Sequence, residues 1–171
     1  MTADADAPLE VKWEGKFVRT LKRGRWEYVS RTRGVTAVVI LAETEGKVVL
    51  IDQYRVPVGN RCLELPAGLV GDEDPNATVE GTAVKELEEE TGYTADQIEV
   101  LGEFQSSPGM LTESFTLVRA TGLRKVGEGG GTDHEDINVH LVAREDIAAF
   151  VAARRAEGMA VDVKLLNFMQ F

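Results

Sequence analysis

The chain contains little cysteine and no long apolar run. Cys62 is its single cysteine, so an internal disulfide and a Cys-x-x-Cys metal site are both excluded. No stretch approaches the roughly 20 apolar residues that a membrane helix needs. The N-terminal residues MTADADAPLE lack the apolar segment of a secretory signal peptide. We therefore expect a cytoplasmic protein without a membrane-spanning segment.

Positive charge is also scarce. The 171 residues include 19 Lys and Arg against 29 Asp and Glu, which gives a net charge of −10. Such a field repels the phosphate backbone of nucleic acids and anionic membrane surfaces, so we expect neither as a partner. With 43% hydrophobic and 28% charged residues, the composition is that of one globular domain. The sequence contains no GxxxxGKS/T P-loop and no GxSxG nucleophile elbow.

Short apolar runs alternate with turn residues, which indicates several strands. A turn at 22–24 separates the first two, and Gly68 and Gly71 end the fifth. Helices are expected at 144–157 and 162–170. This mixed order predicts an α/β or α+β class around a mixed sheet. The expected strands cover 10–22, 25–32, 35–42, 47–54, 62–65, 98–105, 114–120 and 137–142.

The clearest helix signal lies between Asp74 and Gly92. Asp74 is a favourable N-cap, and Pro75 suits the first helical position. Gly92 supplies the stop signal. An inward face repeats at helical spacing and consists of Val84, Leu87 and Thr91.

The same helix carries clustered carboxylates. At about 100° per residue, Glu86, Glu89 and Glu90 share one face, while Glu88 points elsewhere. Like charges three and four residues apart destabilise a helix by about 0.2–0.5 kcal/mol per pair, and a bound cation would reverse that cost. Carboxylates are hard oxygen ligands, which suit Mg²⁺ or Mn²⁺. The face is therefore either a divalent-metal site or a solvated acidic surface.

The residues around this helix resemble a known motif. Residues 63–68 (LELPAG) and 85–93 (KELEEETGY) together resemble the Nudix box, G-x5-E-x7-R-E-U-x-E-E-x-G-U, in which U is apolar. In the preferred register Gly68 is the box glycine, Asp74 takes the first glutamate position, and three extra residues precede the helix. The alternative register uses Gly71 and Ala77 at these two positions.

This resemblance covers roughly residues 10–145 and implies a Nudix fold, an α/β/α sandwich around a mixed β-sheet. It divides the chain into a mobile tail at 1–9, an N-terminal β extension at 10–33 and a Nudix hydrolase domain at 34–171. The implied activity is hydrolysis of nucleoside diphosphates linked to another group, with Mg²⁺ as cofactor and Mn²⁺ as a substitute. The implied metal ligands are Glu86, Glu89, Glu90 and the carbonyl oxygen of Ala67. Lys85 stands where the family has arginine, so a point charge replaces a two-pronged fork.

Further segments resemble the ADP-ribose pyrophosphatase branch, whose members release AMP and ribose 5-phosphate and form homodimers through an N-terminal extension. They are Gln53-Tyr54-Arg55, Ser107-Pro108-Gly109-Met110 and the acidic segment 131–137 (GTDHEDI). The resemblance implies that Trp26 stacks on the adenine and that Gly109 and Met110 lie near the terminal ribose. The alternative for Trp26 is packing in the core or against a neighbouring strand. Arg55 is either a diphosphate ligand or a surface arginine. The implied substrate-binding residues are Trp26, Arg55, Glu64, Gly109 and Met110.

Glu135 is expected to act as general base or as an extra metal ligand, and the expected catalytic residues are Glu135, Glu86 and Glu89. The glycine-rich run at 127–131 can flex, so a carboxylate beyond it can approach an attacking water. Asp133 and Asp136 compete for the same role. The strand residues His140 and Cys62 lack partners in the sequence that would make them catalytic.

Two other functions remain open. One keeps the chemistry and changes the substrate to GDP-mannose, ADP-glucose or a dinucleotide. The other is a Nudix-like module that senses a nucleotide without cleaving it, which Lys85 and the three extra residues favour. The intact glutamate cluster and Glu135 favour an enzyme.

Overall fold

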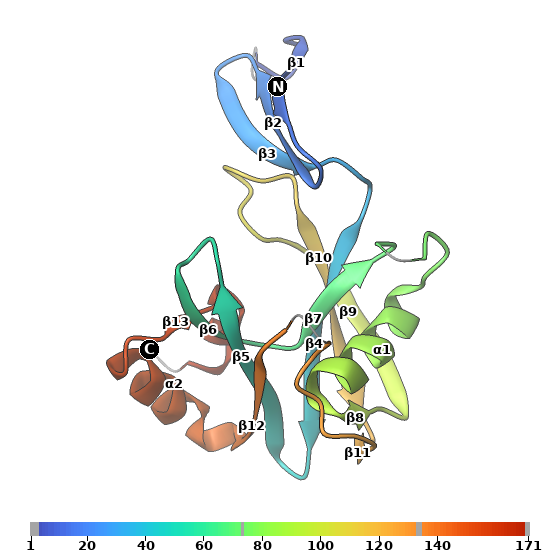
Figure 1. The fold of residues 1–171 in the computed structure, drawn as a ribbon, viewed down its shortest axis with the longest axis vertical. Helices are drawn as coiled ribbons and strands as arrows, with labels where there is room; N and C mark the ends of the chain where they lie inside the picture. The colour runs from blue at the N-terminus through green and yellow to red at the C-terminus, as the bar shows by residue number, and fades with distance from the viewer. Residues whose placement is uncertain (1–3, 73, 133–134, 170–171) are drawn as a thin grey trace.

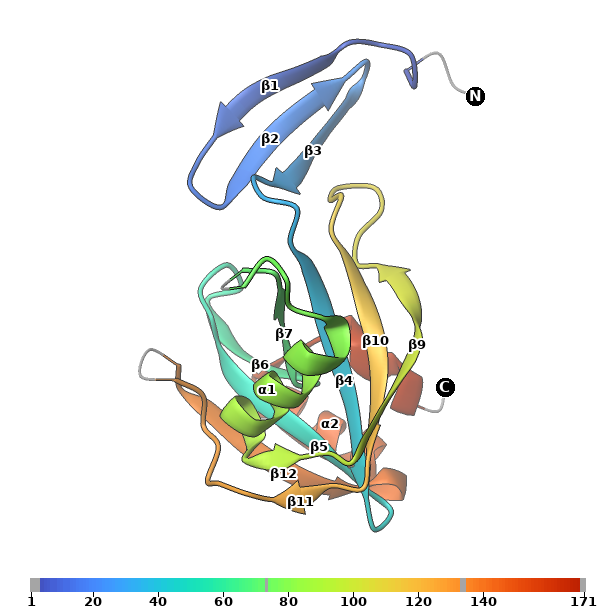
Figure 2. The same cartoon turned by 90° about the vertical axis from the view of Figure 1, so that its right-hand side faces the viewer.

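The computed structural model describes residues 4–72, 74–132 and 135–169. Figures 1 and 2 show a small sheet formed by the N-terminal strands and, below it, a larger body that contains both α-helices. The body is built on an eight-stranded sheet. The chain itself joins the two parts. The loop at 106–113 of the body also contacts the small sheet, where the Val29 N–H donates to the Met110 carbonyl at 2.9 Å.

The sheet of the body is mixed. Its order is β13-β6-β5-β4-β10-β9, with β12 paired to β5 and β7 paired to β4. The pairs β4/β10 and β6/β13 are parallel, and the other pairs are antiparallel. The elements of the body are β4 (Thr36–Thr44), β5 (Lys47–Arg55), β6 (Asn60–Glu64), β7 (Ala67–Val70), α1 (Val79–Thr91), β9 (Gln97–Gln105), β10 (Ser114–Thr121), β12 (Ile137–Ala143), α2 (Ile147–Ala156) and β13 (Ala160–Val161).

Strand β4 supplies side chains to both faces of this sheet. Val38 and Ile40 pack with Leu87 of α1 on one face. Val39 packs with Val151 of α2 on the other face. All five side chains are at most 1% exposed. A helix therefore covers each face (Figure 2), and the predicted α/β class around a mixed sheet is confirmed.

The N-terminal sheet contains three antiparallel strands: β1 (Leu9–Glu14), β2 (Val18–Arg23) and β3 (Trp26–Arg31). The predicted single strand at 10–22 is wrong, because the chain reverses at 15–17, where the Gly15 N–H donates to the Val18 carbonyl. The predicted turn at 22–24 lies instead at Gly24 and Arg25, because Lys22 and Arg23 belong to β2. The tail boundary expected at residue 9 falls one residue inside β1, and residues 1–3 lie outside the described residues.

Helix α1 begins later than predicted. Its N-cap is Thr78, whose Oγ1 accepts a hydrogen bond from the Gly81 N–H at 3.1 Å. Asp74 instead accepts from the Asn76 N–H at 2.9 Å and so caps a separate turn. The predicted cap at Asp74 is therefore wrong, since a second capping residue lies four positions further on. The predicted end at Gly92 is confirmed, with a left-handed φ of 71°.

The expectation that Gly68 ends a strand is also wrong. After Pro66 the chain enters β7, in which Gly68 pairs with Val38 of β4. A Cβ at Gly68 would overlap the Glu86 carboxylate, so glycine here permits close packing of β7 against α1. Gly71, with φ of 87°, follows the end of β7.

The remaining predicted strands and the first C-terminal helix are confirmed within a few residues. The second C-terminal helix is a 3-10 helix, η2 (Val163–Phe168), and α2 follows a 3-10 turn, η1 (Arg144–Asp146). The two-residue strands β8 (Tyr93–Thr94), β11 (Arg124–Lys125) and β13 were missed, because two residues show no periodicity. Within the described part of the chain, no helix is long and apolar enough to cross a membrane.

The end of α1 gives a prediction about stability. Gly92 and Gly46 have similar positive φ angles, 71° and 75°. A Cβ at Gly46 meets nothing within 4 Å, whereas one at Gly92 would overlap the Gly127 carbonyl. We expect Gly46→Ala to destabilise the fold by about 1 kcal/mol, the cost of the left-handed conformation. Gly92→Ala should cost at least about 1 kcal/mol more, because backbone must move.

Urea unfolding of both variants measures the difference. Equal losses would show that the loop at Gly127 moves aside without cost. Gly46→Ala serves as the matched control, since it changes backbone conformation alone.

Candidate functional site

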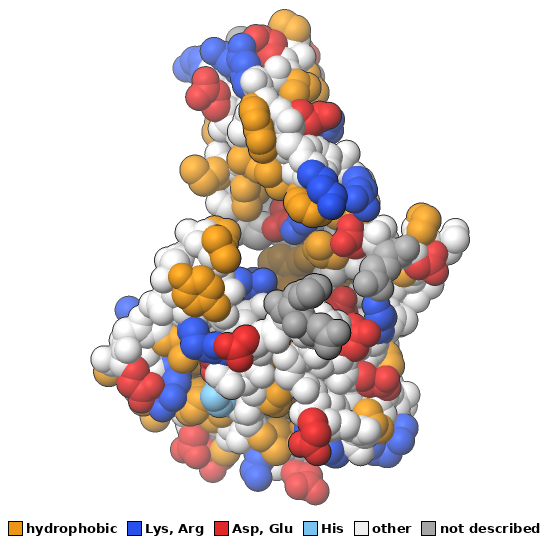
Figure 3. Space-filling view, viewed as in Figure 1, with side chains coloured by type: hydrophobic (Ala, Val, Ile, Leu, Met, Phe, Trp, Pro, Cys, Tyr) orange, Lys and Arg blue, Asp and Glu red, His pale blue; other side chains and the backbone are white. Residues whose placement is uncertain are grey.

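A cavity of about 890 Å³ opens on the body between β5, β6, β7, β10 and α1. Figure 3 shows the hollow below the N-terminal sheet. Side chains from elements far apart in the sequence meet there. Its charged lining residues include Arg31, Arg55, Glu64, Lys85, Glu86, Glu90, Glu113, Glu135 and Lys164.

Glu90 is the most deeply buried acid of this cavity, at 3% exposure. Its Oε2 accepts a hydrogen bond from the Ala67 N–H at 3.0 Å. Burial raises the pKa of Glu90 to about 8, although the Ala67 N–H opposes the shift. The negative charges of Glu86 and Glu135 raise this pKa further, and Arg55 opposes them. A carboxylate in this position is therefore costly to ionise unless a cation accompanies it.

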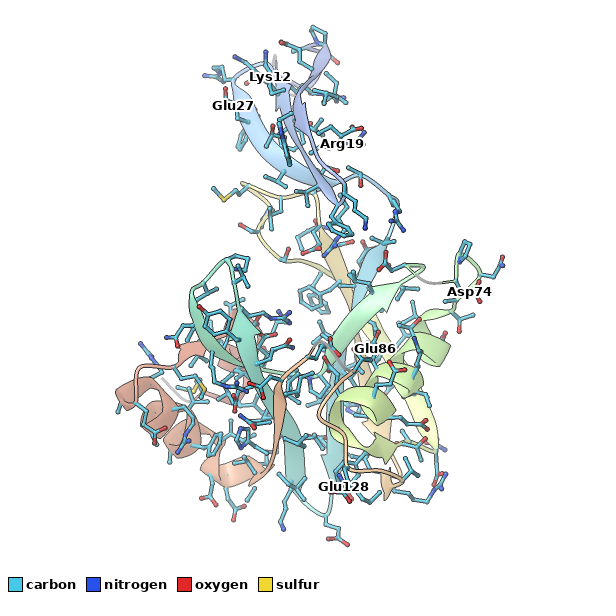
Figure 4. The ribbon with its side chains drawn as sticks, in the orientation of Figure 1. Lys12, Arg19, Glu27, Asp74, Glu86 and Glu128 are labelled. Atoms are coloured by element: carbon cyan, nitrogen blue, oxygen red, sulfur yellow. The ribbon has the colours of Figure 1, made fainter. Side chains whose placement is uncertain are left out.

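Glu86 lies one helical turn before Glu90. Figure 4 labels it on α1, next to the central strands. Its side chain packs against Gly68 and lines the cavity. The structure thus places Glu86, Glu90 and Ala67 at one wall, as the sequence predicts. Ala67 directs its N–H toward Glu90, whereas the sequence analysis assigned a role to its carbonyl.

Glu89 stands apart from these residues. It is not among the residues that line the cavity. Its carboxylate lies 3.8 Å from the Lys85 Nζ, one turn earlier on the helix. Its backbone carbonyl accepts a hydrogen bond from the Gly131 N–H at 3.0 Å. Around the helix Glu89 falls between Lys85 and Glu86, which both line the cavity, so it shares the predicted face, but its carboxylate lies against Lys85.

Arg55 and Glu64 form a two-pronged pair on the opposite wall. The Arg55 Nε and Nη2 donate to the two carboxylate oxygens of Glu64, both at 2.8 Å. The Glu64 side chain is only 7% exposed. The hydrogen bonds to Glu64 raise the pKa of Arg55, so its positive charge is firmly held at the cavity. Arg55 is therefore not an isolated surface arginine.

Glu135 lines the cavity, and Asp136 does not. The Glu135 carboxylate accepts hydrogen bonds from the N–H and the hydroxyl of Thr132, at 2.8 and 3.1 Å. Asp136 instead pairs with Arg61 at 2.7 Å. Asp133, the other candidate base, and His134 lie outside the described residues. Of the described candidates, Glu135 alone is placed to act at this cavity.

The glycine-rich run before Glu135 packs on the end of α1. The Gly130 N–H donates to the Glu90 carbonyl at 2.9 Å, and the Gly127 N–H to the Gly92 carbonyl at 3.1 Å. Gly129 approaches the backbone of Thr91 so closely that a Cβ would overlap it. These glycines thus permit close backbone contact, a role that the sequence analysis missed. The clustering of glycines at 127–131 was the sequence signal that could have predicted this close contact.

Trp26, Gly109 and Met110 lie elsewhere. Trp26 and Gly109 line a second hollow of about 300 Å³ between β3 and the loop at 107–112. Trp26 is 52% exposed and Met110 is 64% exposed. Among the described residues, none lines both hollows. Within one chain, the structure therefore does not bring these three residues to the acidic cavity.

His140 and Cys62 lie in strands, as predicted. The His140 Nε2 is 2.6 Å from the Asp52 carboxylate, a partner 88 positions earlier in the sequence. Burial raises the pKa of the Cys62 thiol to about 12, so the thiol is unreactive near neutral pH.

The acidic wall has the chemistry of a divalent-metal site. In the described part of the chain, no three acidic, histidine or cysteine side chains are gathered closely enough to hold an ion alone. Mg²⁺, however, is commonly bound by one or two carboxylates together with substrate phosphates and water. Glu86 and Glu90 supply such oxygens, and the cost of ionising buried Glu90 would fall beside a cation. Glu86 and Glu90 are therefore suitable ligands for a divalent cation such as Mg²⁺.

The raised pKa of Glu90 predicts how stability depends on pH in metal-free protein. Unfolded glutamate loses its proton near pH 4.5, while folded Glu90 keeps it to about pH 8. The free energy of unfolding is therefore not reduced by Glu90 below pH 4.5. It falls as the pH rises from 4.5 to 8, by up to about 1.4 kcal/mol per pH unit. Glu90→Gln should remove this slope, and the exposed control Glu88→Gln should retain it.

Urea unfolding in EDTA between pH 5 and 9 gives these slopes. If Glu90→Gln and the unmodified chain have the same slope, Glu90 ionises normally in the fold.

Comparison with known proteins places the chain among relatives. An ADP-ribose pyrophosphatase of Bacillus subtilis is 38% identical over 121 residues, which are 69% of this chain and 63% of that protein. A GDP-mannose pyrophosphatase of Yersinia pestis is 31% identical over 166 residues, 92% of this chain and 77% of that one. A methanol dehydrogenase activator of Bacillus methanolicus is 40% identical over 109 residues, 63% of this chain.

The chain spans only part of some of these relatives, 56% of the activator and 63% of the Bacillus subtilis protein. The crystal structure of an ADP compounds hydrolase has a similar fold, with a TM-score of 0.68 and 21% sequence identity. That match covers 88% of this chain and 86% of the solved chain. The NUDIX domain family matches residues 32–161, most of the chain. With the fold and this match in agreement, the chain belongs to the Nudix family.

Proposed function

We propose that the chain hydrolyses the diphosphate bond of ADP-ribose or a related nucleoside diphosphate sugar. ADP-ribose would yield AMP and ribose 5-phosphate. The observation that carries the proposal is that Glu86, Glu90, Glu135 and Arg55 all line one cavity. Two of the relatives support it by their names, which specify ADP-ribose and GDP-mannose.

The proposed cofactor is Mg²⁺, with Mn²⁺ as a substitute. A divalent ion bound there would neutralise phosphate charge and lower the pKa of bound water. Glu86 and Glu90 are the proposed ligands at the cavity wall. Glu89 and Ala67 stay predicted ligands, although Glu89 needs a rotation of its side chain away from Lys85 to contribute.

The remaining residues orient the substrate and accept the proton. Arg55 uses Nε and Nη2 to hold Glu64, so Nη1 is the atom through which it would contact the diphosphate. Glu135 would take the proton from the attacking water as the diphosphate bond breaks. Glu64 then acts mainly by fixing the guanidinium plane of Arg55. Arg55, Glu64 and Glu135 reach the cavity from β5, from β6 and from the segment before β12.

We propose that the chain acts as a homodimer through its N-terminal extension, predicted at 10–33. Large apolar side chains on this sheet are exposed, with Trp13 at 56% and Phe17 at 58%. A small sheet with such exposed faces gains stability when another surface covers it. A second chain would also explain how Trp26 can stack on a base, since Trp26 lies outside the cavity of its own chain. Cytoplasmic location stays a prediction.

The second candidate function is nucleotide sensing without cleavage. The Lys85 substitution and the loop that precedes α1 favour it. The Lys85 Nζ lies 3.8 Å from the Glu89 carboxylate. A lysine ammonium is a point charge and cannot make the two-pronged contact to a glutamate that arginine can. Tight ADP-ribose binding with Mg²⁺ and without product would support sensing.

A product assay tests the main proposal. We expect AMP and ribose 5-phosphate from ADP-ribose with Mg²⁺, and no product in EDTA. Glu90→Gln should lower kcat by about 100-fold or more, because it removes a buried negative ligand oxygen. Glu88→Gln, on the exposed side of the same helix, should keep full activity.

GDP-mannose, ADP-glucose and dinucleotides are assayed in parallel. Faster turnover of one of these would change the substrate and keep the mechanism. If none is cleaved, the chain is not a hydrolase of this class.

The dimer proposal gives a separate prediction. Trp13→Ser combined with Phe17→Ser should shift the chain toward monomer in light scattering, because it removes apolar surface from the contact. Trp26→Ala should raise KM for ADP-ribose by about 10-fold with little change in kcat, since a stacking contact is worth about 1–3 kcal/mol. A monomeric chain with unchanged KM in Trp26→Ala would contradict both roles.

A further inference from the structure

A buried acid beneath the cavity has no part in the mechanism above. Asp52 of β5 has a side chain that is only 3% exposed. Its carboxylate accepts hydrogen bonds from Arg61, from Asn138 at 3.2 Å and from His140 at 2.6 Å. Burial alone would raise the pKa of Asp52, but these hydrogen bonds outweigh burial and lower it. Asp52 is therefore a fixed negative charge inside the sheet.

Arg61 of β6 connects this buried charge to the segment that carries Glu135. Its Nε contacts the Asp52 carboxylate, and its Nη2 donates to the Asp52 carbonyl at 3.0 Å. The same guanidinium donates through Nη1 to the Asp136 carboxylate at 2.7 Å and through Nη2 to the Asp136 carbonyl at 2.9 Å. Arg61 thus holds both the side chain and the backbone of the residue next to Glu135.

The pairing of Arg61 with Asp136 would be weak by itself, since the Asp136 side chain is 83% exposed. Arg61 is only 27% exposed, however, and Asp52 fixes its orientation from below. A guanidinium fixed in this way loses less conformational freedom when it binds a second group. The buried acid therefore makes the exposed contact effective.

Glu135 is held from its other side as well. Thr132 donates two hydrogen bonds to its carboxylate, and the Gly130 N–H is bound to the carbonyl of Glu90. The Glu135 backbone thus lies between α1 on one side and Arg61 on the other. Loss of either attachment would let the carboxylate move relative to Glu86 and Glu90.

We propose that Arg61 is a positioning residue, which uses Asp52 as its buried counter-charge and Asp136 as its contact to hold Glu135 over the cavity. This inference rests on the proposed function, in which Glu135 takes the proton. Arg61 is not among the residues that line the cavity. A misplacement of about 1 Å in a catalytic group can cost about 100-fold in rate.

The alternative is that the network only joins β5, β6 and β12. A double-mutant cycle separates the two. If Arg61 acts through Glu135, its replacement costs activity only while Glu135 is present. If it only stabilises the sheet, the loss is the same with and without Glu135.

The experiment uses Arg61→Lys, which keeps the charge and loses the fork, and Asp136→Asn, which alters only an exposed side chain. We expect Arg61→Lys to lower kcat for ADP-ribose by roughly 10- to 100-fold, with KM within about twofold. Asp136→Asn should lower kcat less, because the carbonyl contact remains. In the Glu135→Gln background, Arg61→Lys should have no further effect. Glu99→Gln, which breaks the exposed pair of Glu99 with Arg119, is the matched control and should leave kcat unchanged.

Hydrogen exchange of the free protein gives a measurement that does not depend on activity. We expect Arg61→Lys to accelerate exchange at the amides of 135–137 and to leave those of 82–88 unchanged. Equal kcat losses in both backgrounds, or unchanged exchange at 135–137, would overturn the positioning role. If the unmodified chain cleaves no nucleoside diphosphate sugar, the proposed function fails, and the exchange measurement alone decides whether Arg61 holds this segment.

Discussion

The site depends on the burial of one carboxylate where α1 meets β7. Glu90 is held there by the Ala67 N–H, and burial keeps its pKa near 8. Two features make this contact possible. Gly68 has no side chain, so Glu86 can lie directly against β7. Leu87 and Ala83 fix the opposite side of α1 in the core. The apolar face of the helix therefore determines where its acidic edge points.

The carboxylates around this contact differ in the partners that bind them, and this difference separates their roles. Glu64 is paired with Arg55, and Asp52 with Arg61 and His140, so each of these two carboxylates already has a side-chain partner. Glu90 is buried with only a backbone N–H on its carboxylate, so it is the group that gains most from an added cation. Glu135 is exposed and is held by Thr132, so water has access to its carboxylate.

The sequence predicted features that depend on neighbouring residues better than those that depend on distant ones. Strands β4 and β5, the end of α1 at Gly92 and the class of the fold follow from local patterns. The start of α1 did not, because Asp74 and Thr78 are both good caps and only tertiary contacts choose between them. Spacing likewise grouped Glu89 with Glu86 and Glu90, since it shows a shared face and not which side chains of that face line a cavity. The partners of Asp52 come from β6 and β12, and no periodicity connects those positions.

The charge of the cavity explains why a cation matters for binding as well as for chemistry. Within the described residues, its acidic lining residues outnumber its basic ones, which are Arg31, Arg55, Lys85 and Lys164. Arg55 is already engaged by Glu64, Arg31 by Glu113, and Lys164 by Asp162. A diphosphate that enters this cavity would meet a net negative field, because Arg31, Arg55 and Lys164 are already paired with acidic side chains. A divalent ion held by Glu86 and Glu90, as proposed, would reverse the local field opposite Arg55. Substrate affinity and turnover should therefore share one dependence on the metal, because without it the excess of acidic lining residues would repel the substrate.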